Sequence, residues 1–366
     1  MSDKNKNLIS IIVMSVFLFG TGFICWFHGE QEYSLAERRY LKTMPAITWE
    51  NVVSGRFMSD FESYTQDQFP ARDTFRSIKS GVALFAFGKK DNNDLYLADG
   101  YINKLEYPYR QESAEHAIKV FSSVYDKYLE DTDCKVYYAL IPDKGYYMAE
   151  ANGYPTMDYA AMEQDFINGM ENMTYIDLFD VMSLEDFYKT DTHWRQEKIT
   201  DVATVIASAM GKELKAEYEL CKIKVPFYGV YHGQLSLPVA GEELFYLNNE
   251  ELDGCYVYDY TNMREIEIYD LEKAQGTDPY EIYLSGPLSL ITIENPNADT
   301  DAELVVFRDS FGSSIAPLWV ESYSKITLID IRYLYSGMVG NYVAFENQDV
   351  LFLYSTMVLN NSETIK

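Results

Sequence analysis

The chain has 366 residues, of which 47% are hydrophobic and 15% aromatic, enough to build a sizeable core in one large domain or two smaller ones. This composition excludes an intrinsically disordered chain. The 57 acidic and 30 basic side chains give a formal net charge of -27, which repels a polyphosphate backbone and excludes nucleic acid as a partner.

The first element along the chain is an uncharged apolar segment at residues 8–27, with the length that one helix needs to cross a bilayer. Lys4 and Lys6 precede it and acidic residues follow it, which predicts a cytoplasmic tail at 1–7, a transmembrane anchor at 8–27 and an extracytoplasmic remainder. We therefore expect a single-pass protein of the cell membrane, with its N-terminus in the cytoplasm and the anchor in contact with the lipid bilayer.

Two other interpretations of this apolar segment remain open. A cleaved signal peptide is the main competitor, although the run is longer than a usual signal-peptide core and no small-x-small site closes it cleanly. A buried core helix fits less well, because the segment has no polar face.

Residues 28–48 are polar and mixed in charge and predict a juxtamembrane linker, so the exported domain is expected to span residues 49–366. Aromatic residues recur at helical spacing before Pro70, which suits the first position of a second helix. A hairpin is predicted over 94–105, with Asp99-Gly100 at its turn.

Helical and strand patterns then alternate, which is typical of an α/β fold with a parallel sheet and helices on both faces. Helices are expected at 113–129, 159–170 and 195–210, with helical stretches after Ser310 and at 336–345, and strands at 135–141, 174–178, 303–307, 325–331 and 350–354. Between about 212 and 301 the alternation lapses. Strand-like runs at 219–225, 255–260 and 281–284 indicate a β-rich insertion there.

Three cysteines of the expected exported part, Cys134, Cys221 and Cys255, are odd in number and lack the C-x-x-C spacing of zinc or redox sites. Cys221 and Cys255 are the first pair to test for a disulfide. Buried free thiols are equally compatible with the sequence.

Two short polar clusters, at 191–194 and 308–311, lie about 120 residues apart and contain an acid, an imidazole and a hydroxyl. Ser310 directly follows a predicted strand and opens a helix, which places it at the carboxyl edge of the sheet, where open α/β folds bind ligands. The helix amino terminus is expected to supply backbone N–H groups to an oxyanion. Asp191 can orient the ring of His193, which can take the hydroxyl proton of Ser310.

These residues also have simpler interpretations. Asp191, Asp309 and Ser310 each stand where a helix cap is common. A D-x-H pair also occurs among metal ligands, but no further histidine or carboxylate is grouped with it at ligand spacing, so neither a metal nor another cofactor is expected.

Residues 188–194 (Tyr-Lys-Thr-Asp-Thr-His-Trp), followed downstream by 308–311 (Arg-Asp-Ser-Phe), resemble the DHHW family and its relatives, the AlgX and AlgJ proteins of alginate O-acetylation. Residues 37–41, 67–73 and 329–333 add to the agreement. The resemblance implies an SGNH-hydrolase-like, flavodoxin-like domain over most of the exported part, and the order of the acid-base pair before the serine fits the permuted arrangement of the acetylation proteins.

The resemblance also implies roles for single residues. Asp191 and His193 match the family's acid and base, and Ser310 matches its nucleophile. Arg332 matches an arginine near the active site that could steady an oxyanion or a sugar hydroxyl, although a salt-bridged structural arginine fits the pattern too. Arg308 departs from the wider superfamily, where a glycine often precedes the Asp-Ser pair.

The activity implied is O-acetylation in the cell envelope. Such a protein receives acetyl groups from a membrane-bound O-acyltransferase partner and passes them through an acetyl-serine to a cell-surface polysaccharide. Two alternatives stay open from the residues: a carbohydrate esterase that uses the same triad with water as the acceptor, and a non-catalytic glycan-binding or scaffold component of such a system.

Overall fold

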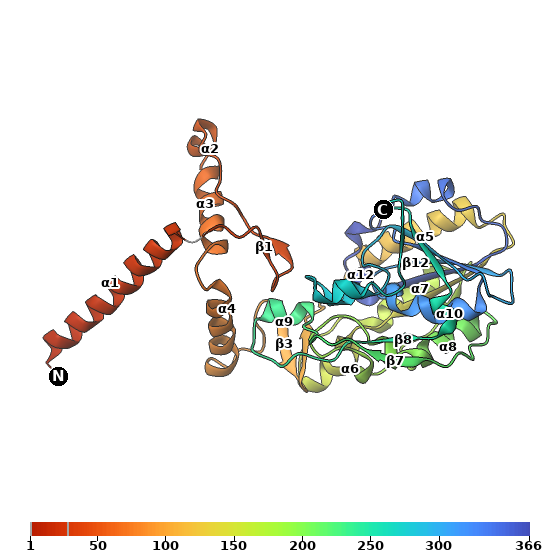
Figure 1. Ribbon diagram of the computed structural model, residues 1–366, viewed down its shortest axis with the longest axis horizontal. Coiled ribbons are helices and arrows are strands. Elements are labelled where there is room, and N and C mark those ends of the chain that lie inside the picture. Colours follow the sequence, from red (N-terminus) through yellow and green to blue (C-terminus); the bar gives the residue numbers. More distant parts are fainter. Residues whose placement is uncertain (1, 28) are drawn as a thin grey trace. The chain divides into compact units, whose positions relative to one another are not determined.

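The computed structural model describes residues 2–27 and 29–366, and the packing divides the chain into two compact units (Figure 1). The first unit comprises residues 1–93 with 232–239, and the second comprises 94–231 with 240–366. This packing boundary falls after Asn93, and the extracytoplasmic domain expected over residues 49–366 stays a prediction. Met1 and His28, which the sequence assigned to the tail and the linker, lie outside the described residues.

The first unit begins with helix α1 (Asp3–Phe27). Its stretch from Asp3 to Cys25 is long and apolar enough to cross a membrane, with a mean hydropathy of 2.4 over its most apolar window. A helix of this length and composition satisfies its own backbone hydrogen bonds, as the bilayer core requires. The helical state of residues 8–27 is confirmed, and the crossing and its direction stay predictions.

The remainder of the first unit is ordered from residue 29 onward. Residues predicted as a linker contain a short antiparallel pair, and three helices and a π-helical turn follow it: β1 (Tyr33–Ser34), β2 (Arg39–Tyr40), α2 (Trp49–Val53), α3 (Arg56–Asp67), α4 (Arg72–Gly81) and the turn Val82–Ala86. Both predicted helices are present. Pro70 precedes α4 by two residues instead of opening it, because Ala71 adopts a left-handed conformation with φ of 54°.

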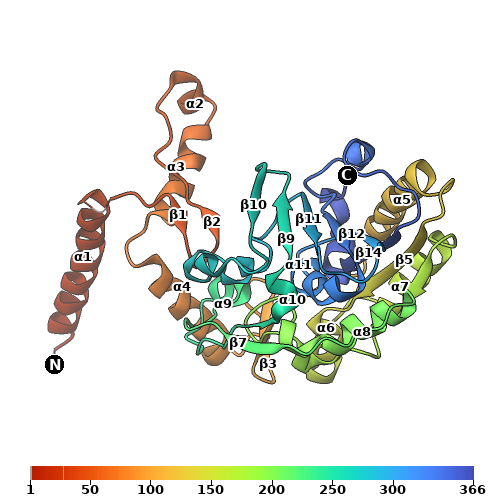
Figure 2. The ribbon, with the colours of Figure 1, turned by 45° about the vertical axis from the view of Figure 1, so that its right-hand side comes forward.

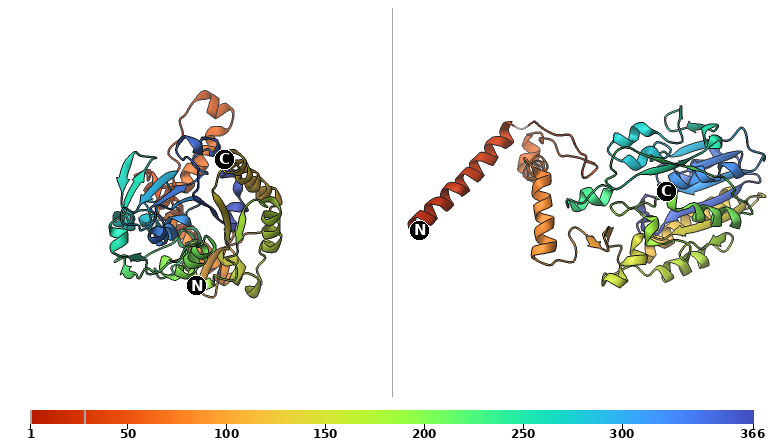
Figure 3. Two further views of the ribbon diagram at one scale, coloured as in Figure 1. Left: turned by 90° about the vertical axis from the view of Figure 1, so that its right-hand side faces the viewer. Right: turned by 60° about the horizontal axis from the view of Figure 1, so that its bottom comes forward.

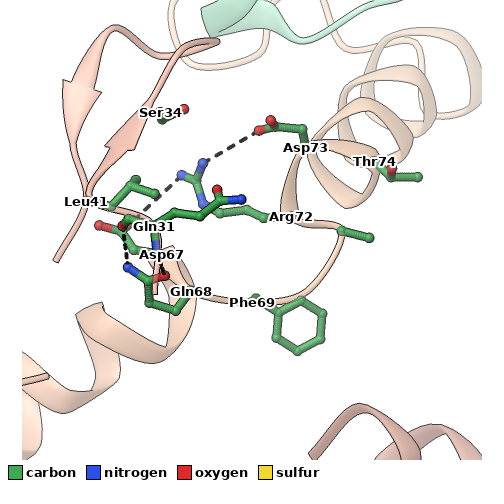
Figure 4. A pocket seen from close by; sticks show the side chains of 10 residues that line it. Gln31, Ser34, Leu41, Asp67, Gln68, Phe69, Arg72, Asp73 and Thr74 are labelled. Atoms are coloured by element: carbon green, nitrogen blue, oxygen red, sulfur yellow. Dashed lines mark hydrogen bonds and ion pairs between the residues drawn. The ribbon is translucent and has the colours of Figure 1, made fainter. Parts of the chain in front are cut away.

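Two sequence motifs of the family resemblance meet in this unit through ion pairs. Arg39 donates to both carboxylate oxygens of Asp67, at 2.9 and 2.6 Å, and this pairing lowers the pKa of Asp67. Arg72 pairs with Glu37 at 2.6 Å, and its side chain lies between Asp67 and Asp73 (Figure 4). The motifs at 37–41 and 67–73 therefore stabilise the first unit.

Eight strands form the central sheet of the second unit (Figure 2), in the order β10-β9-β11-β13-β12-β14-β5-β6. From β13 to β6 all neighbours are parallel, and β11, β9 and β10 extend the sheet antiparallel. The strands are β5 (Lys135–Ile141), β6 (Thr174–Ile176), β9 (Tyr256–Asp259), β10 (Arg264–Ile266), β11 (Leu290–Glu294), β12 (Glu303–Arg308), β13 (Lys325–Ile329) and β14 (Asp349–Ser355). The five parallel strands are the five predicted ones.

Both faces of this sheet are buried by helices (Figure 3). Along β12, Leu304 and Val306 join the core beneath α8 (Thr200–Ala209), while Val305 and Phe307 join the core on the side of α5 (Gln111–Tyr128) and α7 (Tyr159–Gly169). Successive side chains of a strand point to opposite faces, and each fully buried one contributes roughly 1.5–3 kcal/mol. The predicted α/β fold is confirmed.

The hairpin and the insertion complete the second unit. Strands β3 (Leu95–Ala98) and β4 (Tyr101–Lys104) form the predicted hairpin, with positive φ at both Asp99 and Gly100. Within the insertion, a separate pair and a short helix accompany β9–β11: β7 (Glu219–Lys222), β8 (Phe245–Asn248) and α10 (Glu250–Asp253). A second short helix of the insertion, α9 (Val230–Leu235), begins in the second unit and continues into residues 232–239 of the first.

The strand expected at 281–284 is wrong. Residues Pro279–Ile282 form a 3-10 helix instead, because Asp278 caps the backbone N–H of Tyr280 and proline suits a helix start. The two cysteines proposed for a disulfide, Cys221 and Cys255, are free thiols, as are Cys25 and Cys134.

Candidate active site

The predicted nucleophile lies on a tight turn after β12. The buried carboxylate of Asp309 accepts hydrogen bonds from the N–H of Phe311 at 3.0 Å and from the N–H of Ser355 at 2.8 Å. Ser355 ends β14, the neighbouring parallel strand, so this second bond fastens the turn to the sheet. Asp309 therefore holds the turn in place, a structural role like that of the helix cap which its position in the sequence suggested. Ser310 lies at the carboxyl edge of the sheet, as expected.

Gly312 allows this turn to fold back on its strand. A Cβ at this position would lie 2.6 Å from the Cβ of Arg308, which is too close for any other residue. The helix that follows is short, α11 (Gly312–Ile315), and continues as a 3-10 helix over Ala316–Ser322.

The predicted acid and base lie on the loop before α8. Asp191 is fully buried, and its Oδ1 accepts from His193 Nδ1 at 2.6 Å and from the His193 backbone N–H at 3.0 Å. Because an ionised carboxylate only accepts, the ring proton belongs on Nδ1, which leaves Nε2 as an acceptor.

The three predicted residues meet. His193 Nε2 lies 2.7 Å from Ser310 Oγ, within the range needed for proton transfer between a base and a hydroxyl. His193 is 7% exposed, and Ser310 is only partly buried, so a substrate can reach the hydroxyl while the acid stays dry. This geometry can generate a serine alkoxide for attack on an acyl carbon.

Tyr280, from the insertion, was not foreseen at the site. Its ring stacks on the ring of His193 with 3.9 Å between centroids and 8° between planes. Its hydroxyl lies 2.7 Å from Ser314 Oγ, which also accepts from the indole N–H of Trp194 at 2.8 Å. Burial raises the pKa of Tyr280, so the phenol stays neutral. The stack fixes the plane of the histidine ring.

The insertion also holds the acid in place. Asp191 Oδ2 accepts from the N–H of Val230 at 2.7 Å. Beside it, a Cβ on Gly229 would lie 2.3 Å from the carbonyl oxygen of Thr190 and 2.4 Å from the Asp191 Cα, so only glycine allows this approach. Glu242 accepts from the Thr190 hydroxyl at 2.6 Å. No sequence signal marked these three insertion residues.

Arg332 and Arg308 lie at the same sheet edge. Arg332 donates through Nε and Nη2 to the two oxygens of Asp330, at 2.9 and 2.6 Å. Arg308 is fully buried and donates to the carbonyls of Asp309 and Leu288, both at 3.3 Å. Within residues 2–27 and 29–366, neither guanidinium has a hydrogen bond to Ser310 or His193. The role of Arg332 toward substrate stays a prediction.

The backbone groups after Ser310 are engaged within the turn. The N–H of Phe311 bonds to the Asp309 carboxylate, the N–H of Gly312 to the Asp309 carbonyl and the N–H of Ser313 to the Ser310 carbonyl. These three N–H groups therefore have partners within the turn, and the supply of backbone N–H groups to an oxyanion stays a prediction. In the described part of the chain, no group of three or more histidine, cysteine or carboxylate side chains could hold a metal ion.

A mixed α/β sheet, parallel over five strands, with a Ser-His-Asp arrangement at its carboxyl edge defines a class of α/β protein that can support serine acyl transfer. The structure is similar to that of a DHHW family protein from Eubacterium siraeum, with a TM-score of 0.60 and 19% identity over 75% of this chain and 95% of that one. It is also similar to Bacillus cereus PatB1, with a TM-score of 0.57 and 21% identity over 75% of this chain and 99% of that one.

A weaker likeness, with a TM-score of 0.46 and 13% identity, links the chain to the O-acetyltransferase domain of Pseudomonas putida AlgJ over 73% of this chain and 92% of that one. No protein-family model matches the sequence, and no curated protein matches it either. At these identities the first two likenesses establish the fold, and they confirm at that level the resemblance to the DHHW family drawn from the sequence.

Proposed function

We propose that this chain is a membrane-anchored extracytoplasmic O-acetyltransferase, which passes acetyl groups to a cell-surface polysaccharide through an acetyl-serine at Ser310. The observation that carries the proposal is the run of hydrogen bonds from Ser310 Oγ through the ring of His193 to Asp191, with distances of 2.7 and 2.6 Å. This arrangement is one that activates a serine hydroxyl for acyl transfer.

The reaction has two halves. Ser310 Oγ attacks the acetyl carbonyl of the donor, His193 Nε2 takes the hydroxyl proton and returns it to the leaving group, and the acetyl-serine remains. A sugar hydroxyl then attacks the acetyl carbon, its proton passes to His193, and Ser310 is released with its proton restored. Asp191 stabilises the imidazolium in both halves.

The proposed membrane anchor is consistent with acetyl transfer at the cell surface. Residues 8–27 would hold the catalytic part on the outer side of the membrane, with residues 1–7 in the cytoplasm. A membrane-bound O-acyltransferase is the proposed partner that supplies acetyl groups there. Arg332 is proposed to place positive charge near the oxyanion or a sugar hydroxyl. It follows β13, the parallel neighbour of the strand β12 that leads to Ser310, and this position supports the proposal.

The test uses the full chain in detergent with an activated acetyl ester. We expect an acetyl group on the peptide that contains Ser310, detected by mass spectrometry, and its absence in Ser310→Ala and His193→Ala. A sulfonyl reagent should modify the same serine, since Bacillus cereus PatB1, which shares the fold, is known with a sulfonyl adduct. If the chain forms no acetyl-serine and Ser310→Ala leaves turnover unchanged, the proposal is wrong.

The same preparation separates the alternatives. Product analysis with a glycan acceptor should give an acetylated glycan, whereas acetate release that the glycan does not alter would identify a carbohydrate esterase. A non-catalytic scaffold would leave cell-surface acetylation unchanged in a strain that carries both His193→Ala and Ser310→Ala.

A further inference from the structure

Helix α4 of the first unit has its polar side turned inward. Arg76 Nη2 donates to the carbonyl of Gly233 at 2.9 Å, which ties the helix to residues 232–239 of its own unit. Ser80 is buried, and its hydroxyl accepts from the side chain of Asn92 at 2.9 Å. Polar groups thus make these two contacts of α4 with its unit, while Phe75, near the start of α4, packs edge to face on Phe69 with 5.4 Å between ring centroids.

The apolar side of the same helix is exposed. Phe75, Ile78, Val82 and Phe85, which we call the outer stripe, follow one another at intervals of three and four residues and are 42%, 55%, 41% and 72% exposed. The helical backbone continues from α4 through the π-helical turn, so the four side chains share one face. A helix on a water-soluble protein shows the reverse arrangement, with its apolar face on the core.

Basic side chains accompany the outer stripe. Residues 72–90 contain five basic residues and one acidic residue, in a chain whose net charge is -27. Lys79, the residue after Ile78, and Lys89, which follows the end of the helical segment, are both exposed. A helix with phenylalanine and aliphatic residues on one face and lysine at its borders is suited to the boundary between lipid headgroups and acyl chains.

We propose that the outer stripe lies in the outer surface of the bilayer that α1 crosses, with Lys79 and Lys89 at anionic headgroups. The inference rests on the membrane anchoring in the proposed function. It assigns to residues 72–87 a second, surface-parallel contact with lipid, which keeps the first unit at the membrane. Three observations carry it: the outward apolar face, the local positive charge, and the tether that α1 provides within the same unit.

The experiment uses the full chain in nanodiscs of phosphatidylcholine, with or without phosphatidylglycerol. Single cysteines for a spin label are introduced at Ile78→Cys and Phe85→Cys after the four native cysteines are replaced by serine. Collision with oxygen, which enriches in lipid, is compared with collision with a water-soluble nickel complex. We expect several-fold higher relative access to oxygen at both positions, stronger in the anionic discs, and weaker when Lys79→Gln and Lys89→Gln are combined.

Two control positions give reference values for a site in the bilayer and a site in water. Leu18→Cys, in α1, reports whether the anchor is in the bilayer, and Glu112→Cys, exposed on α5 of the second unit, reports the aqueous value. Photo-crosslinking of the unmodified chain with a diazirine lipid checks the result without substitutions, and adducts on residues 72–87 are expected.

The possible results separate cleanly. Nickel access at Ile78 and Phe85 equal to that at Glu112, with Leu18 embedded, overturns the lipid contact and leaves the anchor intact. Nickel access at Leu18 overturns both. Protection of the outer stripe that appears only when a membrane-bound acyltransferase is added would assign the stripe to a protein partner and overturn the lipid proposal. None of these results alters the acetyl-serine test at Ser310.

Discussion

The ring of Tyr280 covers the ring of His193 at 3.9 Å, nearly parallel to it. We expect Tyr280→Ala to lower the free energy of unfolding by about 3–5 kcal/mol, because it leaves a cavity, and to slow acetyl-serine formation, because the imidazole loses its support. Tyr280→Phe keeps the stack and loses the bond to Ser314, so a loss of about 1 kcal/mol and a small rate effect are expected. Denaturant unfolding measures the change in stability, and single-turnover acetylation measures the change in rate. If Tyr280→Ala and Tyr280→Phe form the acetyl-serine at equal rates, the Tyr280 ring does not contribute to the reaction.

The two buried aspartates of the site should respond differently to loss of charge. Asp191→Asn keeps an acceptor for Val230 but cannot stabilise an imidazolium, so we expect turnover to fall by about 10³-fold or more with little change in stability. Asp309→Asn loosens the turn held at Ser355, and its main expected effect is a lower unfolding midpoint. A stable, fully active Asp191→Asn variant would contradict the proposed role of the acid.

Gly229 tests the support that the insertion gives to the acid. Gly229→Ala puts a methyl group 2.3 Å from a backbone oxygen, so the loop with Asp191 must move. We expect a loss of turnover of about 10²-fold, since a displacement of an ångström costs that much in a positioned site. Gly81→Ala is the matched control: nothing lies within 4 Å of its added Cβ, and it should be neutral or slightly stabilising.

Lys144 joins the hairpin to the loop that carries the acid. Its buried side-chain nitrogen donates to the carbonyls of Ile102 at 2.6 Å and Tyr188 at 3.1 Å. Lys144→Met leaves two buried carbonyls without this donor, so we expect a loss of about 1–3 kcal/mol in unfolding free energy. Lys135→Met, at an exposed position, should change it by less than about 0.5 kcal/mol. Denaturant titration of the two variants checks the difference.

Asp143 predicts a pH dependence of stability. Burial and the nearby Glu106 raise the pKa of Asp143 to about 6, although Thr356 and Tyr159 donate hydrogen bonds to it. Because the folded pKa lies above the unfolded one, the carboxyl group stabilises the fold below pH about 4, and this contribution is lost as the pH rises to about 6. The stability of wild type relative to Asp143→Asn should therefore fall across that window, as followed by denaturant unfolding. A rise in that interval would contradict the assigned direction.

The parallel core of the fold could be predicted, because four of its five strands, all but the edge strand β6, are mainly apolar runs buried on both faces. Strand β10 could not, since it is a short edge strand with exposed charged residues. The strand predicted at 281–284 was wrong because the composition of this run suits a strand. The cap at Asp278 and the proline that follows it start a helical turn there instead.

One part of the candidate site could also be predicted from the sequence, and another part could not. Ser310, Asp191 and His193 carry local signals, since each lies beside a strand or helix end with a side chain that chemistry needs. Tyr280 and Val230 act through contacts with residues that are far away in the sequence. Tyr280 is one of 32 tyrosines, and Val230 contributes only its backbone N–H. No sequence pattern near either position indicates its role in the site.

The hydrogen bond from Val230 to Asp191 comes from the backbone and not from a side chain. Val230 is the first residue of α9, so the carboxylate accepts from the start of this helix. A substitution at position 230 changes the side chain and leaves the N–H in place, and only proline removes the donor. The support that Asp191 receives from the insertion is therefore insensitive to most changes of residue type at that position.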